Sequence, residues 1–320
     1  MRITIIGCGR WGSLIGWYLD TLGHEVTLYG RAESRHMQRF LAERRNDLLQ
    51  LGERIHLTTE MGPVLDADIL VLAVGAQSLW EVCRTMCAYG LRNRRIVLCM
   101  KGLEKETGKR LTEIVADELD PSNRVAVWLG PGHVQDFYAG IPSCMVIDSA
   151  DNRLKQELIE AFSGPLIRFY FGQDLIGNEI GAAAKNVIGI GAGMLDGSGM
   201  STLKGPLMSR GTREIARLIK AAGGSELSAY GLCHLGDYQA TLFSPYSHNR
   251  RFGEAFVKNE PYSELAEGYD TVQALMVLAG KYGVELPICG AVYEVLFGGK
   301  RFPDILEQLF ARSLKHEFRE

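Results

Sequence analysis

The first thirty residues constrain the fold more than any other stretch of the chain. Residues 2–6 (RITII) are apolar and rich in β-branched side chains, which predicts a buried strand. Residues 7–12 (GCGRWG) follow at once, then a helical pattern over 13–22 and a second strand over 24–29. A strand, a GxGxxG turn, a helix and a strand in this order indicate a dinucleotide-binding βαβ unit.

The glycines of this turn each have a separate steric task. Gly7 permits the tight turn, Gly9 lets a pyrophosphate approach the backbone, and Gly12 lets the helix pack on the strand. The N-terminus of the helix predicted over 13–22 then faces the phosphates. An ordinary glycine-rich loop is the alternative, and the flanking strands and helix disfavour it.

The end of the second predicted strand bears on which dinucleotide is bound. It ends Tyr29-Gly30-Arg31, with Arg35 close behind and Glu33 as the nearest acid. An acid at the tip would favour NAD, whereas an arginine suits a 2′-phosphate. We therefore expect NADP, while NAD or dual use stays open and a purely solubilising role for the two arginines is the alternative.

Later patterns predict two domains. Five apolar runs continue an α/β sheet, at 67–74, 95–100, 125–129, 143–147 and 167–170. Strand signals stop after about Gly177, and the clearest later helices span 206–222, 264–282 and 287–297. A charged stretch over 33–54 also indicates a helix. The expected fold is an α/β Rossmann-like doubly wound domain (1–177) followed by an all-α domain (178–320).

One lysine lies in the middle of a strongly apolar helix. Residues 181–195 are almost entirely small or apolar around Lys185, which predicts a buried helix. Burying an unpaired ammonium costs several kcal/mol and lowers its pKa. Lys185 therefore either pairs with a buried acid or transfers protons in a site, and a lysine that snorkels to the surface is the alternative.

Other polar candidates lie at strand ends and in one later polar run. Lys101 follows the strand at 95–100, and a glycine loop at 130–132 follows the strand at 125–129. Ligands bind outside the carboxyl ends of strands in such sheets. The run over 234–251 looks loop-like and offers an acid, hydroxyls, an amide, a histidine and arginines, which suits a small anionic, hydroxylated molecule. A surface lysine and a surface turn are the alternatives.

Bulk properties exclude several classes of partner. The net charge is 35 − 38 = −3, which gives no reason to expect nucleic acid. The seven cysteines are scattered without a CxxC pair, so free thiols in a reducing compartment are expected. No secretory signal and no apolar run of about 18 residues occurs, which predicts a cytoplasmic protein without a membrane span. The seven histidines show no paired-ligand spacing, so no metal is expected.

Together these motifs resemble the NAD(P)-dependent glycerol-3-phosphate dehydrogenase family. The matching stretches follow the family's order over nearly the whole chain: the GxGxxG turn, 101–104 (KGLE), 130–131 (GP), 184–188 (AKNVI), 191–194 (GAGM), 235–237 (LGD), 249–253 (NRRFG), 267–269 (EGY) and 284–288 (VELPI). The resemblance implies reversible reduction of dihydroxyacetone phosphate to sn-glycerol 3-phosphate with NAD(P)H. It also implies a role in phospholipid biosynthesis and a homodimer formed through the helical domain.

The resemblance assigns roles to individual residues. Lys185 falls on the catalytic proton donor and acceptor, and Lys101 and His248 fall on positions that touch both ligands. Substrate positions are Lys101, Gly130, Gly132, Asn186, Asp237, Thr241, Ser247, His248 and Asn249. Cofactor positions are Arg10, Trp11, Arg31, Lys101, Val134, Ala266 and Glu267, beside the glycines of the turn and Arg35.

Three residues depart from the family's pattern. His248 stands where the family usually has an arginine that grips the phosphate, Gly132 replaces a small hydroxyl residue, and His234 replaces a glycine. Arg250 or a protonated His248 would supply the missing grip. A related 2-hydroxyacid dehydrogenase with another small anionic substrate, or a catalytically silent NADPH-binding sensor, are the alternative functions.

Overall fold

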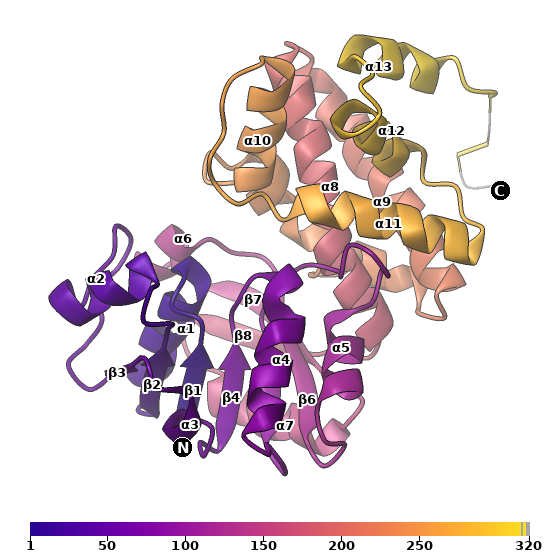
Figure 1. Cartoon of the computed structure of the whole chain (residues 1–320). Coiled ribbons are helices and arrows are strands. Elements are labelled where there is room, and N and C mark those ends of the chain that lie inside the picture. The colour runs from indigo at the N-terminus through magenta and orange to yellow at the C-terminus, as the bar shows by residue number, and fades with distance from the viewer. Residues whose placement is uncertain (315, 318–320) are drawn as a thin grey trace.

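The computed structural model describes residues 1–314 and 316–317 and contains one large sheet topped by a set of helices (Figure 1). The sheet has eight strands in the order β3-β2-β1-β4-β5-β6-β7-β8. The strands are β1 (Arg2–Ile6), β2 (Glu25–Tyr29), β3 (His56–Thr58), β4 (Ile69–Leu72), β5 (Arg95–Leu98), β6 (Arg124–Leu129), β7 (Ser143–Asp148) and β8 (Ile167–Phe171).

Neighbouring strands are parallel except β6 and β7, where Trp128 lies opposite Ile147 in antiparallel register. Strand β1 lies between β2 and β4 in the sheet. The chain adds strands on the β2 side first and then returns to add β4 on the other side, so the strand order reverses beside β1. Ligands of open α/β sheets bind in the crevice at such a reversal, outside the carboxyl ends of the strands. The second set of helices lies over that edge (Figure 1).

Two layers of helices cover the sheet. On one face the core includes Leu14 of α1, Phe40 of α2 and Leu158 of α7, and on the other Leu79 of α4 and Ile114 of α5. The helices of this part are α1 (Arg10–Thr21), α2 (Arg35–Glu43), α3 (Met61–Val64), α4 (Leu79–Ala88), α5 (Leu111–Glu118), α6 (Val134–Tyr138) and α7 (Asn152–Phe162).

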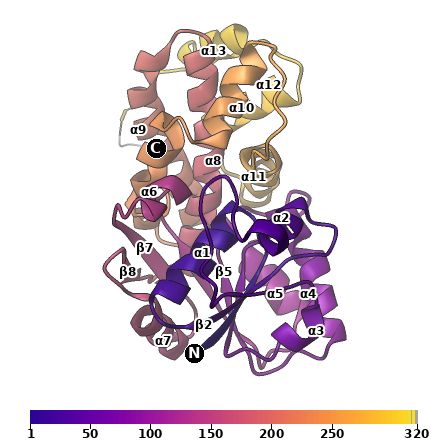
Figure 2. The ribbon, with the colours of Figure 1, turned by 90° about the vertical axis from the view of Figure 1, so that its left-hand side faces the viewer.

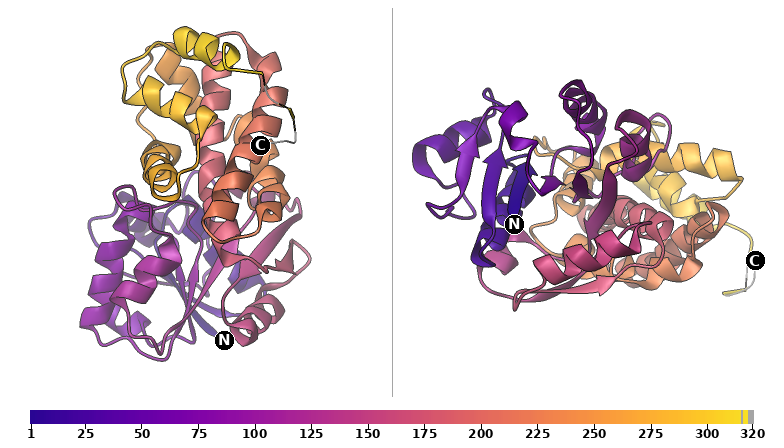
Figure 3. Two further views of the ribbon diagram at one scale, coloured as in Figure 1. Left: turned by 90° about the vertical axis from the view of Figure 1, so that its right-hand side faces the viewer. Right: turned by 90° about the horizontal axis from the view of Figure 1, so that it is seen from below.

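The rest of the described chain is helical and has its own core. Figures 2 and 3 show these helices stacked on the sheet, with α8 running upward from the sheet into the stack. The helices are α8 (Leu175–Gly197), α9 (Lys204–Ala221), α10 (His248–Val257), α11 (Gly268–Tyr282), α12 (Pro287–Leu296) and α13 (Phe302–Phe310). Short 3₁₀ turns include Leu235–Asp237, and a π-helix spans Gln239–Phe243.

Helix α8 is the shared wall of this helical core, and α10 packs against it with the two backbones in contact. A Cβ added to Gly193 of α8 would lie 1.9 Å from the carbonyl oxygen of Arg250. A Cβ added to Gly253 of α10 would lie 2.1 Å from the carbonyl oxygen of Ile190. Only glycine permits this approach.

The fold class predicted from sequence is confirmed, with local corrections. The helix expected over 33–54 is wrong beyond Glu43, because Arg44 takes a left-handed conformation (φ 52°) and a β-bridge joins Arg45 to Gln50. Strand β3 was not predicted because its three residues, HLT, carry no apolar run. The prediction that residues 234–251 form a loop is also wrong, since this run contains the π-helix and the first turn of α10.

Candidate active site

The glycine turn at the carboxyl end of β1 has the shape that a dinucleotide requires. Gly7 has φ +114°, and a Cβ on Gly12 would lie 1.9 Å from the carbonyl oxygen of Gly7. Gly9, in contrast, has no heavy atom within 4 Å of its Cβ position, which leaves room beside the N-terminus of α1. Backbone N–H groups at such a terminus attract phosphate.

A cavity of about 330 Å³ adjoins this turn. Gly7, Gly9 and Arg31 line it, as do Ser34 and His36, which sequence reasoning did not select. Arg35 is not among the residues that line it. The exposed guanidinium of Arg31 lies 3.3 Å from Glu33, at the end of β2 where an adenosine ribose would lie. The open glycine cradle and this cavity fit a nicotinamide dinucleotide.

Lys185 lies in the third turn of α8, and its amine is buried among polar groups. Its Nζ lies 3.0 Å from Oδ2 of Asp237 and donates a hydrogen bond of 2.8 Å to the hydroxyl of Thr241. The Thr241 hydroxyl in turn donates to the carbonyl oxygen of Asp237. The prediction that the lysine is buried and paired with an acid is confirmed.

Lys101, after β5, approaches the same carboxylate from the sheet. Its Nζ lies 2.8 Å from Oδ2 of Asp237 and 2.6 Å from the carbonyl oxygen of Gly130. The ring of Trp11 lies 5.8 Å from the Lys101 ammonium. Two ammonium groups therefore share one oxygen of a carboxylate that is 1% exposed. The other oxygen of Asp237 is buried with no hydrogen-bond partner among the described residues.

This arrangement changes the acidity of Lys185. Burial lowers its pKa from 10.5 to about 8; Asp237 opposes the shift and the Lys101 charge adds to it. A group with such a pKa exchanges protons readily near neutral pH. Glu267, half-buried at the start of α11, has a raised pKa because of burial, which the two lysines oppose.

An irregular backbone presents the groups that hold Lys185. Asp237 ends a 3₁₀ turn, and Thr241 lies inside the π-helix that follows. The π-helix is rare and often occurs at functional sites. His133, next to the glycine loop after β6, donates from Nε2 to the carbonyl oxygen of Ala240 at 2.8 Å and so ties this segment to the sheet. The predicted strand-end loop contained His133, but no pattern singled it out.

Two amides connect the segments around the lysines. Asn186 donates to the carbonyl oxygen of Lys101 at 2.8 Å, and Asn249 donates to Oδ1 of Asn186 at 3.1 Å. Oδ1 of Asn249 accepts from the N–H of Gly268 at 2.9 Å. Both predicted amides thus lie beside the lysines and join α8, α10 and α11 to the sheet.

His248, the first residue of α10, faces the glycine turn. Its Nε2 contacts the guanidinium of Arg10, and its Nδ1 lies 2.7 Å from the hydroxyl of Tyr262. Burial lowers the pKa of His248, and the positive charge of Arg10 lowers it further. Tyr262 lies in a loop with no distinguishing pattern, so the sequence offered no signal for it.

The structure accounts for two departures from the family's pattern. Gly132 has φ +145°, and a Cβ there would lie 2.2 Å from the ring of Phe137, which leaves no space for a hydroxyl side chain. His234 is fully buried, and its ring bonds to the carbonyl oxygen of Gly181 and the hydroxyl of Tyr238. Burial lowers the pKa of His234 to about 4, so this ring is a neutral part of the core.

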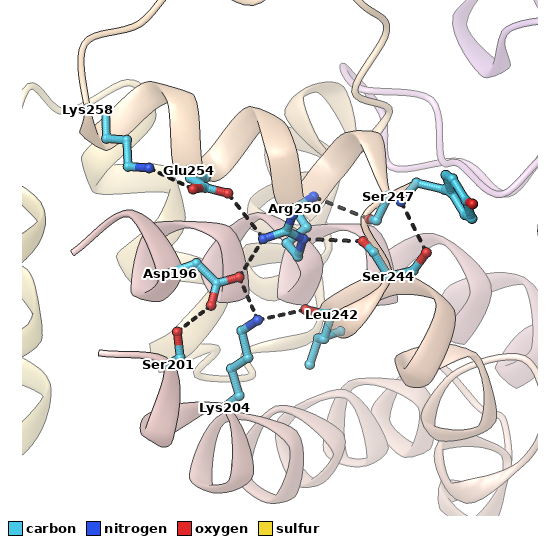
Figure 4. Close-up of polar contacts among 10 residues, drawn as sticks. Asp196, Ser201, Lys204, Leu242, Ser244, Ser247, Arg250, Glu254 and Lys258 are labelled. Atoms are coloured by element: carbon cyan, nitrogen blue, oxygen red, sulfur yellow. Dashed lines mark hydrogen bonds and ion pairs between the residues drawn. The ribbon is translucent and has the colours of Figure 1, made fainter. Parts of the chain in front are cut away.

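Arg250 pairs with acidic side chains rather than with the groups around Lys185 (Figure 4). Its guanidinium lies 2.7 Å from Asp196 and 3.1 Å from Glu254. Asp196 also pairs with Lys204 at 2.5 Å, so Arg250 belongs to an ion-pair network at the end of α8. The hydroxyl of Ser247 accepts from the N–H of Arg250 as the cap of α10.

The last two predicted cofactor positions lie on opposite sides of the crevice. Val134 opens α6 and is buried beside Phe137 in the core of the sheet domain. Ala266 is buried just before α11.

A larger cavity, of about 490 Å³, lies elsewhere, between α8, α9, α12 and α13. None of the predicted site residues lines it. Among the described residues, no helix is long and apolar enough to cross a bilayer. The same part of the chain contains no cluster of three or more His, Cys, Asp or Glu side chains placed to hold a metal ion.

Comparisons with known proteins agree with this geometry. The chain is 34% identical over 334 residues to glycerol-3-phosphate dehydrogenase, NAD(P)+, of Exiguobacterium sp., covering 100% of this chain and 98% of that protein. It is 33% identical to the protein of the same name from Bacillus subtilis, covering 100% and 96%. A crystal structure of glycerol-3-phosphate dehydrogenase from Coxiella burnetii superposes with a TM-score of 0.90 at 28% identity, over 97% of this chain and 99% of that one.

Two family models match consecutive parts of the sequence. The model of the NAD-dependent glycerol-3-phosphate dehydrogenase N-terminus matches residues 2–155, and that of the C-terminus matches residues 174–307. The glycine turn and the carboxylate shared by two lysines are consistent with these matches. The matches show that the chain belongs to the NAD-dependent glycerol-3-phosphate dehydrogenase family.

Proposed function

We propose that this protein catalyses the reversible NAD(P)H-dependent reduction of dihydroxyacetone phosphate to sn-glycerol 3-phosphate. The observation that carries the chemistry is the Lys185 amine, buried 3.0 Å from Asp237 with a pKa lowered to about 8. It lies at the edge of the sheet where a dinucleotide bound at the glycine turn would end. The family membership and the curated relatives support the substrate.

Lys185 handles the proton of the reaction. The nicotinamide cofactor supplies the hydride in the reductive direction and accepts it in the other. Negative charge develops on the carbonyl oxygen of the substrate during reduction, and the ammonium of Lys185 stabilises that charge and donates a proton. In the oxidative direction the neutral amine removes the hydroxyl proton of the substrate.

Asp237 holds both lysines and offers its second oxygen to the substrate. Oδ2 binds the ammonium groups of Lys185 and Lys101, while buried Oδ1 has no partner within the described residues. Leaving such an oxygen unpaired is costly, so a substrate hydroxyl that donates to it would be favoured. Thr241 already donates to the backbone and accepts from Lys185, which supports a positioning role.

The remaining predicted residues divide between the two ligands. We place Asn186, Asn249, Ser247, His248, Gly130 and Gly132 around the substrate, and Gly7, Gly9, Gly12, Arg10, Trp11, Arg31, Arg35, Val134, Ala266 and Glu267 around the cofactor. Arg31 supports NADP over NAD, although its ion pair with Glu33 weakens that preference and NAD use is also proposed.

The division into domains, the oligomer and the compartment are also proposals. A boundary at residue 177 lies close to the start of the C-terminal family model at residue 174, after the N-terminal model ends at 155, and inside the first turn of α8. The resemblance supports a homodimer through the helical domain, which sedimentation would test. The unpaired cysteines support a reducing cytoplasm.

An assay with several ketones tests the function. Oxidation of NADPH and of NADH should be followed with dihydroxyacetone phosphate, dihydroxyacetone and a set of 2-keto acids. We expect turnover with dihydroxyacetone phosphate, at a kcat/KM at least 100-fold above that for the others. Preference for a 2-keto acid would favour the hydroxyacid dehydrogenase, and NADPH binding without any turnover would favour the sensor.

A further inference from the structure

We propose that Arg10 supplies the guanidinium that binds the substrate's phosphate and that His248 holds this guanidinium in place across the crevice. The proposal deepens the proposed function and rests on it. It reassigns Arg10, which the resemblance placed beside the cofactor, to the substrate's phosphate, whereas the resemblance placed the phosphate-binding cation at position 248 on α10.

Arg10 carries a positive charge that the protein does not neutralise. Its guanidinium contacts the imidazole of His248, and it forms no ion pair with a carboxylate within residues 1–314 and 316–317. Arg250, by comparison, lies within 3.1 Å of both Asp196 and Glu254. A half-buried guanidinium without a counter-ion favours binding of an anion, and phosphate suits its planar set of donors.

The contact also joins two helix N-termini. Arg10 is the first residue of α1, a helix of 12 residues, and His248 is the first residue of α10, a helix of 10 residues. The partial positive charges at both termini add to that of the guanidinium. The potential at this point of the crevice therefore favours a dianion such as a phosphate monoester.

The chain neighbours of both residues contact the groups around Lys185. Trp11, next to Arg10, lies against Lys101, and Asn249, next to His248, bonds to Asn186. Asn186 follows Lys185 in α8. The Arg10–His248 contact thus adjoins the proposed reaction centre, as the phosphate of a three-carbon substrate requires.

The other candidate cations are less suited to the phosphate. His248 accepts from Arg10 through Nε2 only when the imidazole is neutral, and both burial and Arg10 lower its pKa. Arg250 is occupied by Asp196 and Glu254. Glu264 lies near enough to act on His248 but forms no ion pair with Arg10. Arg251 also forms no ion pair within the described residues, but its side chain is exposed, so Arg10 remains as the half-buried cation with an uncompensated charge at this position.

The test is Arg10→Ser, with Arg251→Ser as the matched control. Arg251 is an exposed arginine on α10 that lies over the ring of Tyr262, and its loss removes one positive charge from the same neighbourhood. We expect Arg10→Ser to lower kcat/KM for dihydroxyacetone phosphate on the order of 100-fold, which matches the loss of charge-assisted hydrogen bonds. The rate with dihydroxyacetone, which has no phosphate, should change far less, and Arg251→Ser should change neither by more than about threefold.

Direct binding separates this inference from the proposed function. Inorganic phosphate is titrated calorimetrically into the NADPH complex of the wild type, of Arg10→Ser and of Arg10→Ser/His248→Arg. Weaker phosphate binding in the single variant, restored by the double variant, is the expected result. Equal losses with both ketones, a raised Kd for NADPH with unchanged phosphate binding, or no rescue would overturn the role of Arg10. A wild type that binds phosphate but does not turn over dihydroxyacetone phosphate would overturn only the proposed function.

A folding defect would not obscure the result. Arg10→Lys keeps the charge and loses the planar fork, so we expect phosphate binding between that of the wild type and that of Arg10→Ser. Circular dichroism and the thermal midpoint confirm that each variant is folded. Phosphate binding by Arg10→Lys equal to that of Arg10→Ser in folded protein would contradict the proposal.

Discussion

Two buried lysines beside α8 differ in the charged groups around them. Lys185 lies within α8, whereas Lys204 opens α9 and pairs with Asp196 near the end of α8. The side chains of Lys185 and Lys204 are both 9% exposed. Around Lys204, the two acids Asp196 and Glu254 pair with Lys204, with Arg250 and with the more exposed Lys258 (Figure 4). Around Lys185, a single buried carboxylate serves two ammonium groups.

Burial alone therefore does not identify the reactive lysine. Lys155 is also buried, and it pairs one-to-one with Asp148 at 3.0 Å. The excess positive charge beside Lys185 adds to desolvation in lowering its pKa, and it leaves the crevice ready to receive an anionic substrate. Lys155 has a counter-ion of its own, whereas Lys185 shares one carboxylate with Lys101.

The largest difference between Lys185 and Lys204 should appear on removal of the ammonium of Lys185. Lys185→Met keeps the length of the side chain and removes the proton donor, so we expect turnover to fall on the order of 10⁴-fold. Binding of NADPH, followed by its fluorescence, should be retained. Turnover within tenfold of the wild type would rule out Lys185 as the proton donor.

Removing the shared carboxylate tests the charge imbalance itself. Asp237→Asn leaves Lys185 and Lys101 without their counter-ion, and we expect kcat/KM for the ketone to fall on the order of 10³-fold. Since Asp237 raises the pKa of Lys185, its loss lowers that pKa further. The pH at which reduction declines should therefore move to lower values, and a shift to higher pH would contradict the arrangement.

The change of kcat/KM with pH in the wild type should be smaller than the effects of the two substitutions above. Lys185 must be protonated for reduction, and its pKa is lowered from 10.5 to about 8. The kcat/KM for reduction should be level below pH 8 and fall about tenfold per pH unit above it. Oxidation needs the neutral amine, so its kcat/KM should rise with pH up to about 8. A reductive rate that stayed level to pH 10 would exclude this group.

The smallest effect on turnover is expected at Lys204, the first residue of α9. Lys204→Met leaves the largely covered carboxylate of Asp196 with one partner fewer, which should lower the free energy of unfolding by about 3 kcal/mol. The folded enzyme should keep kcat within about threefold of the wild type. Denaturant unfolding together with rates corrected for the folded fraction checks both, and a loss of kcat comparable to that of Lys185→Met would remove the distinction between the two lysines.

Local patterns were sufficient to predict the parts of this molecule that depend on sequence neighbours. The GxGxxG turn needs glycines at fixed spacing, and α8 is apolar on every side, so both could be predicted from short stretches. Asp237 was selected by resemblance, but its contact with Lys101 spans 136 residues and no local pattern encodes it. The contact between Arg10 and His248, 238 residues apart, depends on how the helices lie over the sheet and was not predicted.

The direct backbone contact of α8 with α10 has a consequence for how the crevice opens. Between Gly193 and the carbonyl of Arg250 there is no side chain that could change rotamer to absorb a sliding movement. Lys185 and His248 should therefore travel as one rigid block. A spectroscopic label on each of these helices would report a constant separation with and without ligands. A label near Arg10, on the sheet side, would instead report the distance to that block shortening as phosphate arrives.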